Sequence, residues 1–226
     1  MNRQNYIISL FIICLVCSIT LILILMNNLF FAFSWNQNLR ALLPDAEFFF
    51  RYITEFGSTL IYMGVFFILF WAVNKDFAKK LLLIYISSNF INYYAKSIIG
   101  NSRPDQSNWL LIDASHLSTP SGHAMSSTVV WGYLGVKVKN LVNLLVCLII
   151  IILVCLSRMY LGVHWFGDVL TGWCFGIIVI SGTDIIGQSE SKLWRKYQLS
   201  IYIGISVFGF IALIFTEMIN ISAGSR

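Results

Sequence analysis

Long apolar runs, separated by short polar segments, dominate the chain. A membrane-crossing helix needs about 20 mostly apolar residues, and seven runs approach or exceed this length. They cover Tyr6–Phe33, Gly57–Asn74, Phe77–Ile99, Ser121–Val136, Asn140–Arg158, His164–Gly187 and Tyr197–Thr216. None shows the apolar–polar alternation of a membrane β-barrel. The pattern therefore predicts an all-α, polytopic transmembrane bundle of about six or seven spans.

Composition supports this prediction. Hydrophobic residues make up 58% of the chain and charged residues 11%, whereas roughly 25% are charged in a typical soluble domain. The mean hydropathy of +0.79 excludes a soluble globule and a disordered chain. The net charge of +5 comes from too few basic residues to follow a nucleic-acid backbone. All five cysteines lie in apolar runs, which favours packing over redox or metal chemistry.

The ends of the chain and the first polar segment complete the expected organisation. The first run exceeds the roughly 7–15 apolar residues of a signal peptide, so we expect a retained anchor. Residues 1–226 form a single domain, with a core at about 57–187 and an inner loop plus an extra span at 188–226. Between the first two runs, Glu47, Arg51 and Glu55 share one helical face, which predicts an interfacial helix.

Basic residues predict the orientation, since cytoplasmic loops carry the excess of Lys and Arg. With the N-terminus in the cytoplasm, nine of the fifteen basic residues face inward and six outward. The inward set is Arg3, Lys75, Lys79, Lys80, Lys137, Lys139, Lys192, Arg195 and Lys196, and the outward set is Arg40, Arg51, Lys96, Arg103, Arg158 and Arg226. His116, His123 and His164 also face outward. The Ile-, Asn- and Lys-rich composition favours a bacterial plasma membrane.

Three clusters of polar residues lie where predicted spans meet the outer surface. The first, Lys96 to Pro104, has Gly100 to end a helix and Pro104 to extend Arg103, so the chain can fold back and bring both cations onto one anion. The second, Thr119 to His123, opens a span with the N–H groups that favour anions. Alone, these clusters also fit snorkelling basic residues and a plain helix cap.

The third cluster runs from Ser157 to Asp168. His164 and Asp168 are four residues apart, so the carboxylate can hold one ring nitrogen and leave the other as nucleophile or base. Arg158 adds a cation, although an Arg158–Asp168 ion pair is an alternative. Together, Lys96, Arg103 and Arg158 would neutralise a phosphate, which carries about −1.5 to −2 at pH 7. No close carboxylate pair suits Mg²⁺, so the sequence predicts neither metal nor cofactor.

These motifs resemble the signature of the type 2 phosphatidic acid phosphatase family, which is similar in its site to vanadium haloperoxidases. The family reads Lys, six residues, Arg-Pro; then Pro-Ser-Gly-His; then Ser-Arg, five residues, His, three residues, Asp. Lys96–Pro104, Pro120–His123 and Ser157–Asp168 match every motif position in order. A seventh span departs from the family's commonest six-helix arrangement.

The resemblance implies a haloperoxidase-like helical core and a role for each motif residue. His164 would form a phosphohistidine, Asp168 would orient it, and His123 would act as acid and then base. Lys96, Arg103 and Arg158 would clamp the phosphate, with hydrogen bonds from Ser121 and Gly122. The expected partners are a lipid phosphate and the surrounding membrane lipids, with no nucleic acid.

The expected function is a metal-independent phosphatase that hydrolyses a lipid phosphate or diphosphate monoester at the outer membrane face. A lipid phosphotransferase that uses the same phosphohistidine is the close alternative. A non-catalytic transporter or binding protein is a remote one, because transporters place polar groups near the bilayer midplane. Elsewhere, Asp184 is expected to be a snorkelling charge at the inner end of its span.

The orientation can be tested with a cysteine placed in the 101–119 loop. Because the charge bias puts this loop outside, we expect an impermeant thiol reagent to label it in intact cells. The native cysteines, all in apolar runs, supply the background in the unmodified chain. Labelling only after permeabilisation would invert the topology.

Overall fold

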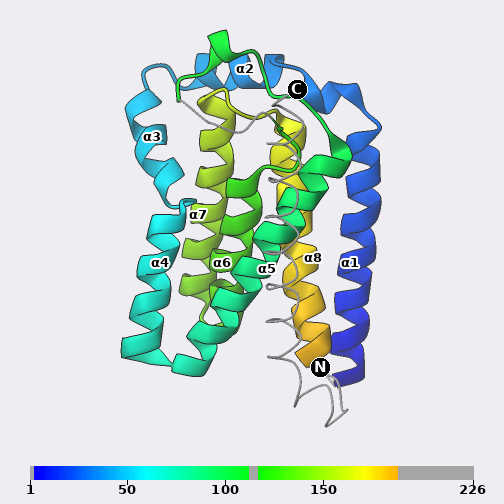
Figure 1. Ribbon diagram of the computed structural model, residues 1–226, viewed down its shortest axis with the longest axis vertical. Coiled ribbons are helices and arrows are strands. Elements are labelled where there is room, and N and C mark those ends of the chain that lie inside the picture. Colours follow the sequence, from blue (N-terminus) through cyan, green and yellow to red (C-terminus); the bar gives the residue numbers. More distant parts are fainter. Residues whose placement is uncertain (1–2, 112–116, 188–226) are drawn as a thin grey trace, which may run out of the picture.

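Long helices running along one axis form the body of the protein (Figure 1). The structure, a computed structural model, describes residues 3–111 and 117–187; the predicted seventh span, His116 and four of the basic residues used above (Lys192, Arg195, Lys196 and Arg226) lie outside the described residues. The long helices are α1 (Arg3–Leu25), α5 (Lys75–Ile99), α6 (Gly122–Lys137), α7 (Leu141–Tyr160) and α8 (Phe166–Gly187). Shorter elements are η1 (Asn28–Phe31), α2 (Ser34–Leu42), α3 (Glu47–Glu55), α4 (Thr59–Ile68), the π-helical η2 (Leu69–Val73) and η3 (Gln106–Asn108). The all-helical prediction is confirmed.

Within the described residues, three helices are long and apolar enough to cross a membrane. They are Gln4–Leu25, Leu141–Tyr160 and Phe166–Ile186, and α3 with α4 and η2 makes a fourth if this pair, bent by 47°, is one span. The first predicted run was too long, since α1 ends at Leu25 and a separate short helix follows at Asn28–Phe31. Asn27 causes this break by capping the short helix with its side chain.

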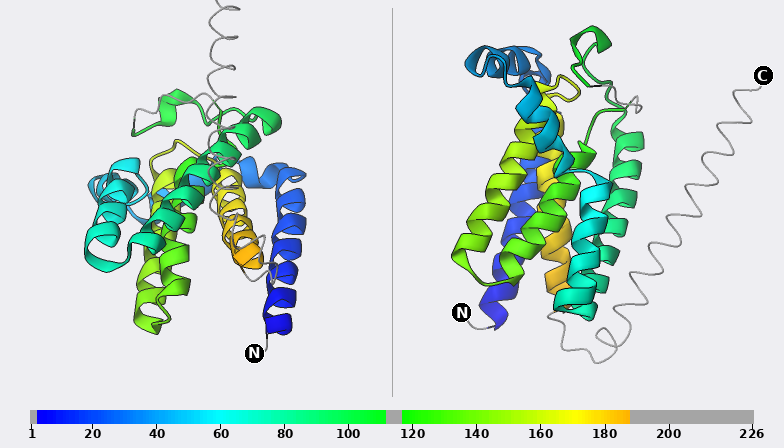
Figure 2. Two further views of the ribbon diagram at one scale, coloured as in Figure 1. Left: turned by 60° about the horizontal axis from the view of Figure 1, so that its bottom comes forward. Right: turned by 90° about the vertical axis from the view of Figure 1, so that its left-hand side faces the viewer.

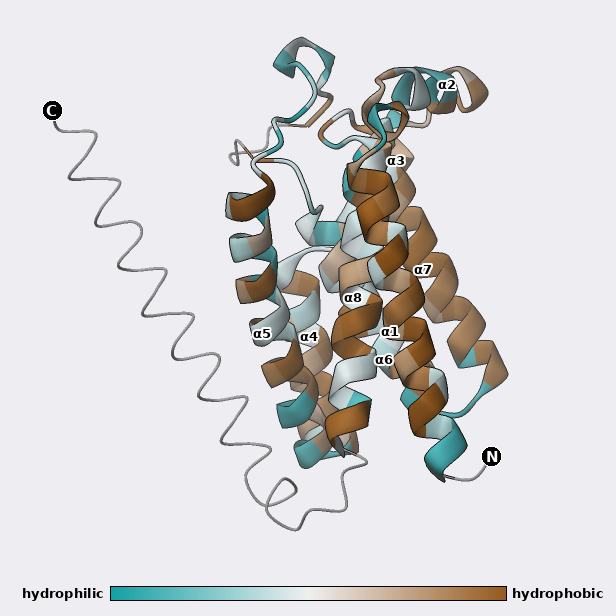
Figure 3. Ribbon diagram, turned by 90° about the vertical axis from the view of Figure 1, so that its right-hand side faces the viewer, coloured by the Kyte–Doolittle hydropathy of each residue, from teal (hydrophilic) through white to brown (hydrophobic). Residues whose placement is uncertain are grey.

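The outer faces of the helices are apolar, whereas polar residues gather at the two ends of the bundle (Figure 3). Phe11, Leu15 and Ile22 of α1 are exposed, as are Leu145 and Ile152 of α7. Long helices with many exposed apolar side chains are typical of membrane spans. The distribution therefore agrees with a membrane protein.

Helices α5, α6 and α8 carry the polar positions and pack closely together. Along α5, Asn89 accepts a hydrogen bond from Ser126 of α6, as expected for polar residues that face the bundle interior. On α8, a Cβ added to Gly172 would lie 2.6 Å from the Ser121 carbonyl oxygen, and one at Gly176 would lie 2.6 Å from Thr128 Cβ. These two glycines let α8 approach the start of α6, where one of the sequence motifs lies.

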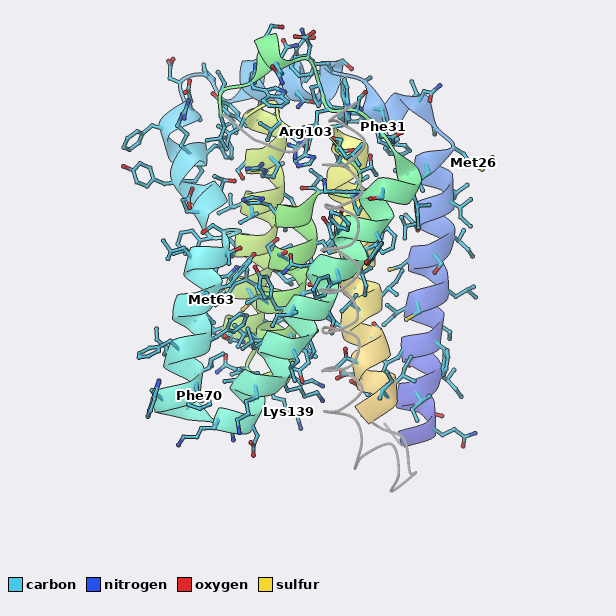
Figure 4. All side chains as sticks on the ribbon, in the orientation of Figure 1. Met26, Phe31, Met63, Phe70, Arg103 and Lys139 are labelled. Carbon is cyan, nitrogen blue, oxygen red and sulfur yellow. The ribbon has the colours of Figure 1, made fainter. Side chains whose placement is uncertain are left out.

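The two ends of the bundle carry different chemistry. The start of α1 and the α6–α7 connection with Lys139 lie at one end, and Arg103 with the α7–α8 connection lies at the other (Figure 4). Helix α2 lies across this second end, nearly perpendicular to the long helices (Figure 2). All three polar motifs therefore meet at the end opposite the N-terminus.

Asp184, near the other end, is buried rather than snorkelling, so that expectation was wrong. Its side chain is 5% exposed and accepts hydrogen bonds from Lys137 Nζ at 2.5 Å and from the Tyr6 hydroxyl at 2.9 Å. The carboxylate thus joins α8 to α6 and α1. A buried charge is tolerated because it has these partners.

This cluster should contribute measurably to stability. We expect Asp184→Ala to lower the free energy of unfolding by about 1–3 kcal/mol, because it leaves the Lys137 ammonium and the Tyr6 hydroxyl without their acceptor. Thermal unfolding in detergent measures the change. The double variant Lys137→Met/Asp184→Leu is the control, since replacing both charges by apolar groups should recover stability. Equal loss in both variants would contradict the assignment.

Candidate functional site

The chain reverses direction after α5 and returns beside it, as the sequence predicted. Gly100 ends the helix with a left-handed φ of 70°. Ser102 then forms an isolated antiparallel bridge with Leu117. Lys96, in the last turn of α5, donates to the carbonyl oxygens of Leu117 and Ser118, each at 2.9 Å. The Lys96 ammonium therefore lies against the segment that leads into α6.

Arg103 extends from this loop to the connection between α7 and α8. Its Nη1 donates to the Val163 carbonyl oxygen at 2.9 Å, and its guanidinium lies 5.8 Å from the centre of the Trp109 ring. The Trp109 indole in turn donates to the Pro104 carbonyl oxygen. These contacts place the guanidinium next to the backbone that precedes His164.

The start of α6 presents the second motif to the same region. Ser121 is fully buried and caps the helix by accepting from Ala124 N, while its own N–H donates to the Asp168 carbonyl oxygen at 2.9 Å. Gly122 is the first helical residue and His123 follows it. A Cβ added to Gly57, at the break between α3 and α4, would lie 3.0 Å from His123 Cδ2. The break therefore packs directly against the His123 ring.

Arg158 projects from the last turn of α7 into the interior and is 1% exposed. Its Nη1 donates to the Thr54 hydroxyl of α3 at 3.0 Å. A charged side chain buried this deeply requires oriented hydrogen-bond acceptors. Thr54 supplies one of them and fixes the position of the guanidinium.

His164 and Asp168 form the buried centre of the site. His164 Nδ1 lies 3.1 Å from Asp168 Oδ2, and the two residues are 1% and 0% exposed. The carboxylate also accepts hydrogen bonds from the hydroxyls of Ser118 and Thr119 and, at 2.8 Å, from Trp165 N. Because Asp168 engages Nδ1, the arrangement leaves Nε2 as the ring nitrogen available to a bound group.

Burial and the surrounding charges both favour the neutral form of the His164 imidazole. Burial lowers the pKa of His164 well below its ordinary value, and the positive charges of Arg103, Lys96, Arg158 and His123 lower it further. Lys96 donates to the carbonyl oxygen of Ser118, whose hydroxyl lies 3.3 Å from His164 Nδ1, and Arg103 donates to the carbonyl oxygen of the residue before His164. The motifs therefore meet at His164. A neutral imidazole among several cations has the character of a nucleophile beside an anion-binding site.

The structure brings together all eight residues that the sequence assigned to the site: Lys96, Arg103, Ser121, Gly122, His123, Arg158, His164 and Asp168. In the described part of the chain, no group of three or more His, Cys, Asp or Glu side chains is placed to hold a metal ion.

Sequence reasoning missed three residues that support the site as hydrogen-bond partners, Asn36, Thr54 and Ser118, and it named Thr119 in the second cluster without its bond to Asp168. Ser118 and Thr119 directly precede Pro120, so their closeness to the motif was an available signal. Thr54 and Asn36 lie more than 100 residues from their partners Arg158 and His164, and no local pattern marks them.

Comparison with known proteins agrees with the family resemblance of the three motifs. Residues 77–187 match the family model described as the PAP2 superfamily, and this range contains all three motifs. Residues 77–187 belong to the PAP2 superfamily. The match begins at α5, so α1 to α4 lie outside it.

Several curated proteins and one solved PAP2 structure resemble the chain. Mouse sphingosine-1-phosphate phosphatase 1 is 30% identical over 145 residues, covering 56% of this chain and 32% of that protein. The chain thus spans about a third of the length of that mammalian relative. Phosphatidylglycerophosphatase B of Bacillus subtilis is 33% identical over 108 residues, covering 44% of this chain and 52% of that protein.

The solved structure is the transmembrane PAP2 type phosphatidylglycerolphosphate phosphatase from Bacillus subtilis. It superposes with a TM-score of 0.61 at 26% identity, covering 79% of this chain and 95% of that chain. The shared arrangement therefore extends beyond residues 77–187 into the N-terminal helices.

The charges around His164 give a prediction about its titration. We expect Arg103→Gln to raise the pKa of His164, because removing a nearby positive charge makes protonation of the ring less costly. NMR titration of histidine-labelled protein in detergent measures this change. The control is Lys139→Gln at the opposite end of the bundle, which should leave the pKa unchanged. A lower pKa in Arg103→Gln would contradict the arrangement.

Proposed function

We propose that the chain is a membrane-embedded, metal-independent phosphatase that hydrolyses a lipid phosphate or diphosphate monoester through a phosphohistidine. The observation that carries this proposal is the buried His164, whose Nδ1 lies 3.1 Å from Asp168 while several cations surround the ring. A phosphate drawn to those cations would meet an uncharged imidazole nitrogen. The site would face the extracytoplasmic side of a bacterial plasma membrane.

In the first step, Nε2 of His164 attacks phosphorus, and the bond between phosphorus and the lipid oxygen breaks. Protonated His123 gives a proton to the leaving oxygen, so the lipid departs as an alcohol, or as a monophosphate if the substrate is a diphosphate. Asp168 stabilises the positive charge that develops on the imidazole. Ser118 and Thr119 keep the carboxylate aligned for this task.

In the second step, water attacks the phosphorus of the phosphohistidine. His123, now neutral, takes a proton from the water, and the nitrogen–phosphorus bond breaks to release inorganic phosphate. The histidine pair returns to its starting protonation state. This cycle needs no metal, because Lys96, Arg103 and Arg158 stabilise the charge on the transferring phosphoryl group.

Two observations support a lipid as the substrate. The site lies at one end of a bundle whose outer faces are apolar, so a phosphate head group can reach it while its tail stays in the bilayer (Figure 3). The relatives are a sphingosine-1-phosphate phosphatase and a phosphatidylglycerophosphatase, both named for phosphorylated lipids.

The test is phosphate release by the purified protein from a panel of lipid phosphates and diphosphates. We expect His164→Ala to abolish release and to remove the acid-labile phosphoenzyme, because it deletes the nucleophile. Activity of the unmodified chain should survive EDTA and be inhibited by vanadate, which mimics phosphate.

The matched control is His116→Ala, which removes the histidine outside the three motifs and should leave release intact. Full activity of His164→Ala would overturn the mechanism, and strict Mg²⁺ dependence would overturn the role given to the cations. Transfer of the phosphoryl group to a second lipid, with no inorganic phosphate, would identify a phosphotransferase instead.

A further inference from the structure

The connection between α7 and α8 carries His164, and donors from outside the two helices hold its backbone. The last carbonyl groups of a helix have no partner within it and must be satisfied otherwise when they are buried. Here the donors are Asn36 Nδ2 to Met159 O and His164 O, Arg40 Nε to Tyr160 O, Leu110 N to Leu161 O, and Arg103 Nη1 to Val163 O. The nucleophile thus lies on a connection that other segments hold in place.

Asn36 of α2 is the donor that reaches the nucleophile itself. It is 0% exposed, and its amide nitrogen donates to Met159 O at 2.8 Å and to His164 O at 3.0 Å. A side-chain amide has two N–H donors, so each carbonyl receives one. The two bonds fix the end of α7 relative to the residue that carries the imidazole.

Hydrogen bonding at position 36 favours asparagine over other side chains of similar size. Leucine has a similar size but would remove the donor to His164 O, which is costly for a buried carbonyl, whereas Met159 O would keep its bond from Gly162 N. Aspartate would turn oxygens toward those carbonyls and would bury a negative charge. On either side of Asn36, Trp35 and Gln37 are exposed, so Asn36 alone among these three turns into the protein.

Neighbouring contacts show that α2 is seated on the connection rather than lying loosely above it. Arg40, one turn further along α2, donates to Tyr160 O at 2.8 Å and to Asn108 O at 2.8 Å. Gly162, with a left-handed φ of 76°, makes this approach possible, because a Cβ there would overlap Asn108 O and the Arg40 guanidinium. The Arg40 hydrogen bonds and the left-handed conformation of Gly162 therefore both keep α2 in contact with the connection.

We infer that Asn36 is a positioning residue for phosphoryl transfer, which sets the place of the His164 imidazole relative to Asp168 and the cations without touching the substrate. This inference rests on the proposed function. Small displacements of a reacting group cost large factors in rate, roughly 100-fold for about 1 Å. Binding of the phosphate depends instead on cations that other segments hold.

The experiment compares Asn36→Leu with Asn38→Leu in the full chain. Asn38 lies on the same helix and is exposed, so it receives the same substitution without losing a buried bond. We expect Asn36→Leu to lower kcat roughly 10- to 100-fold while KM stays unchanged, and Asn38→Leu to change neither. Asn36→Ser keeps one donor, so its kcat should fall between the values of the two leucine variants. This variant tests the positioning role if Asn36→Leu does not fold.

A kcat equal to that of Asn38→Leu, or a loss confined to KM, would overturn the inference. Hydrogen exchange of amides 159–165 gives a readout that needs no turnover, and faster exchange in the Asn36 variants alone supports the positioning role. If the unmodified chain hydrolyses no lipid of the panel but the Asn36 variants still exchange faster, the proposed function fails. The role of Asn36 in fixing the α7–α8 connection is then still supported. Unchanged exchange of these amides in the Asn36 variants would contradict that role.

Discussion

The buried carboxylate of Asp168 joins the parts of the protein that form the site. A carboxylate in an apolar interior is stable only when several donors surround it, and Asp168 has donors from His164, Trp165 and the two hydroxyls of the 118–119 segment. Its backbone carbonyl also accepts from Ser121 N. One group thereby fixes α8, the loop returning from α5 and the start of α6 relative to one another.

The same physical constraint explains the placement of the cations. Lys96, Arg103 and Arg158 each donate to oxygens of neighbouring segments, so each cation that would bind phosphate also holds part of the fold. Mutual repulsion and burial raise the energy of these cations, and an anion that neutralises them would relieve that cost. If that anion is the phosphate of the proposed substrate, stability and affinity for phosphate are coupled in this architecture.

The sequence predicted the part of this arrangement that depends on local patterns. Apolar length indicated the helices, and Gly100 and Ser121 marked helix ends. The four-residue spacing predicted the contact between His164 and Asp168, but not that α8 starts at Phe166, so that His164 precedes the helix. The break after α1 was not predicted, although the Asn27 side chain that caps the next helix is a local feature. The burial of Asp184 was not predicted because it depends on side-chain contacts with distant partners. Thr54 and Asn36 were also not predicted, because their partners are distant in the sequence.

Helix α2 has a consequence for how the superfamily can diversify. The family match begins at residue 77, yet an amide and a guanidinium from residues 36 and 40 hold the connection that carries His164. Relatives that share the three motifs but differ before α5 would have to supply equivalent donors from some other segment. The N-terminal helices and the α7–α8 connection should therefore have evolved together, and exchanging one without the other between relatives would separate an intact motif from the support it needs.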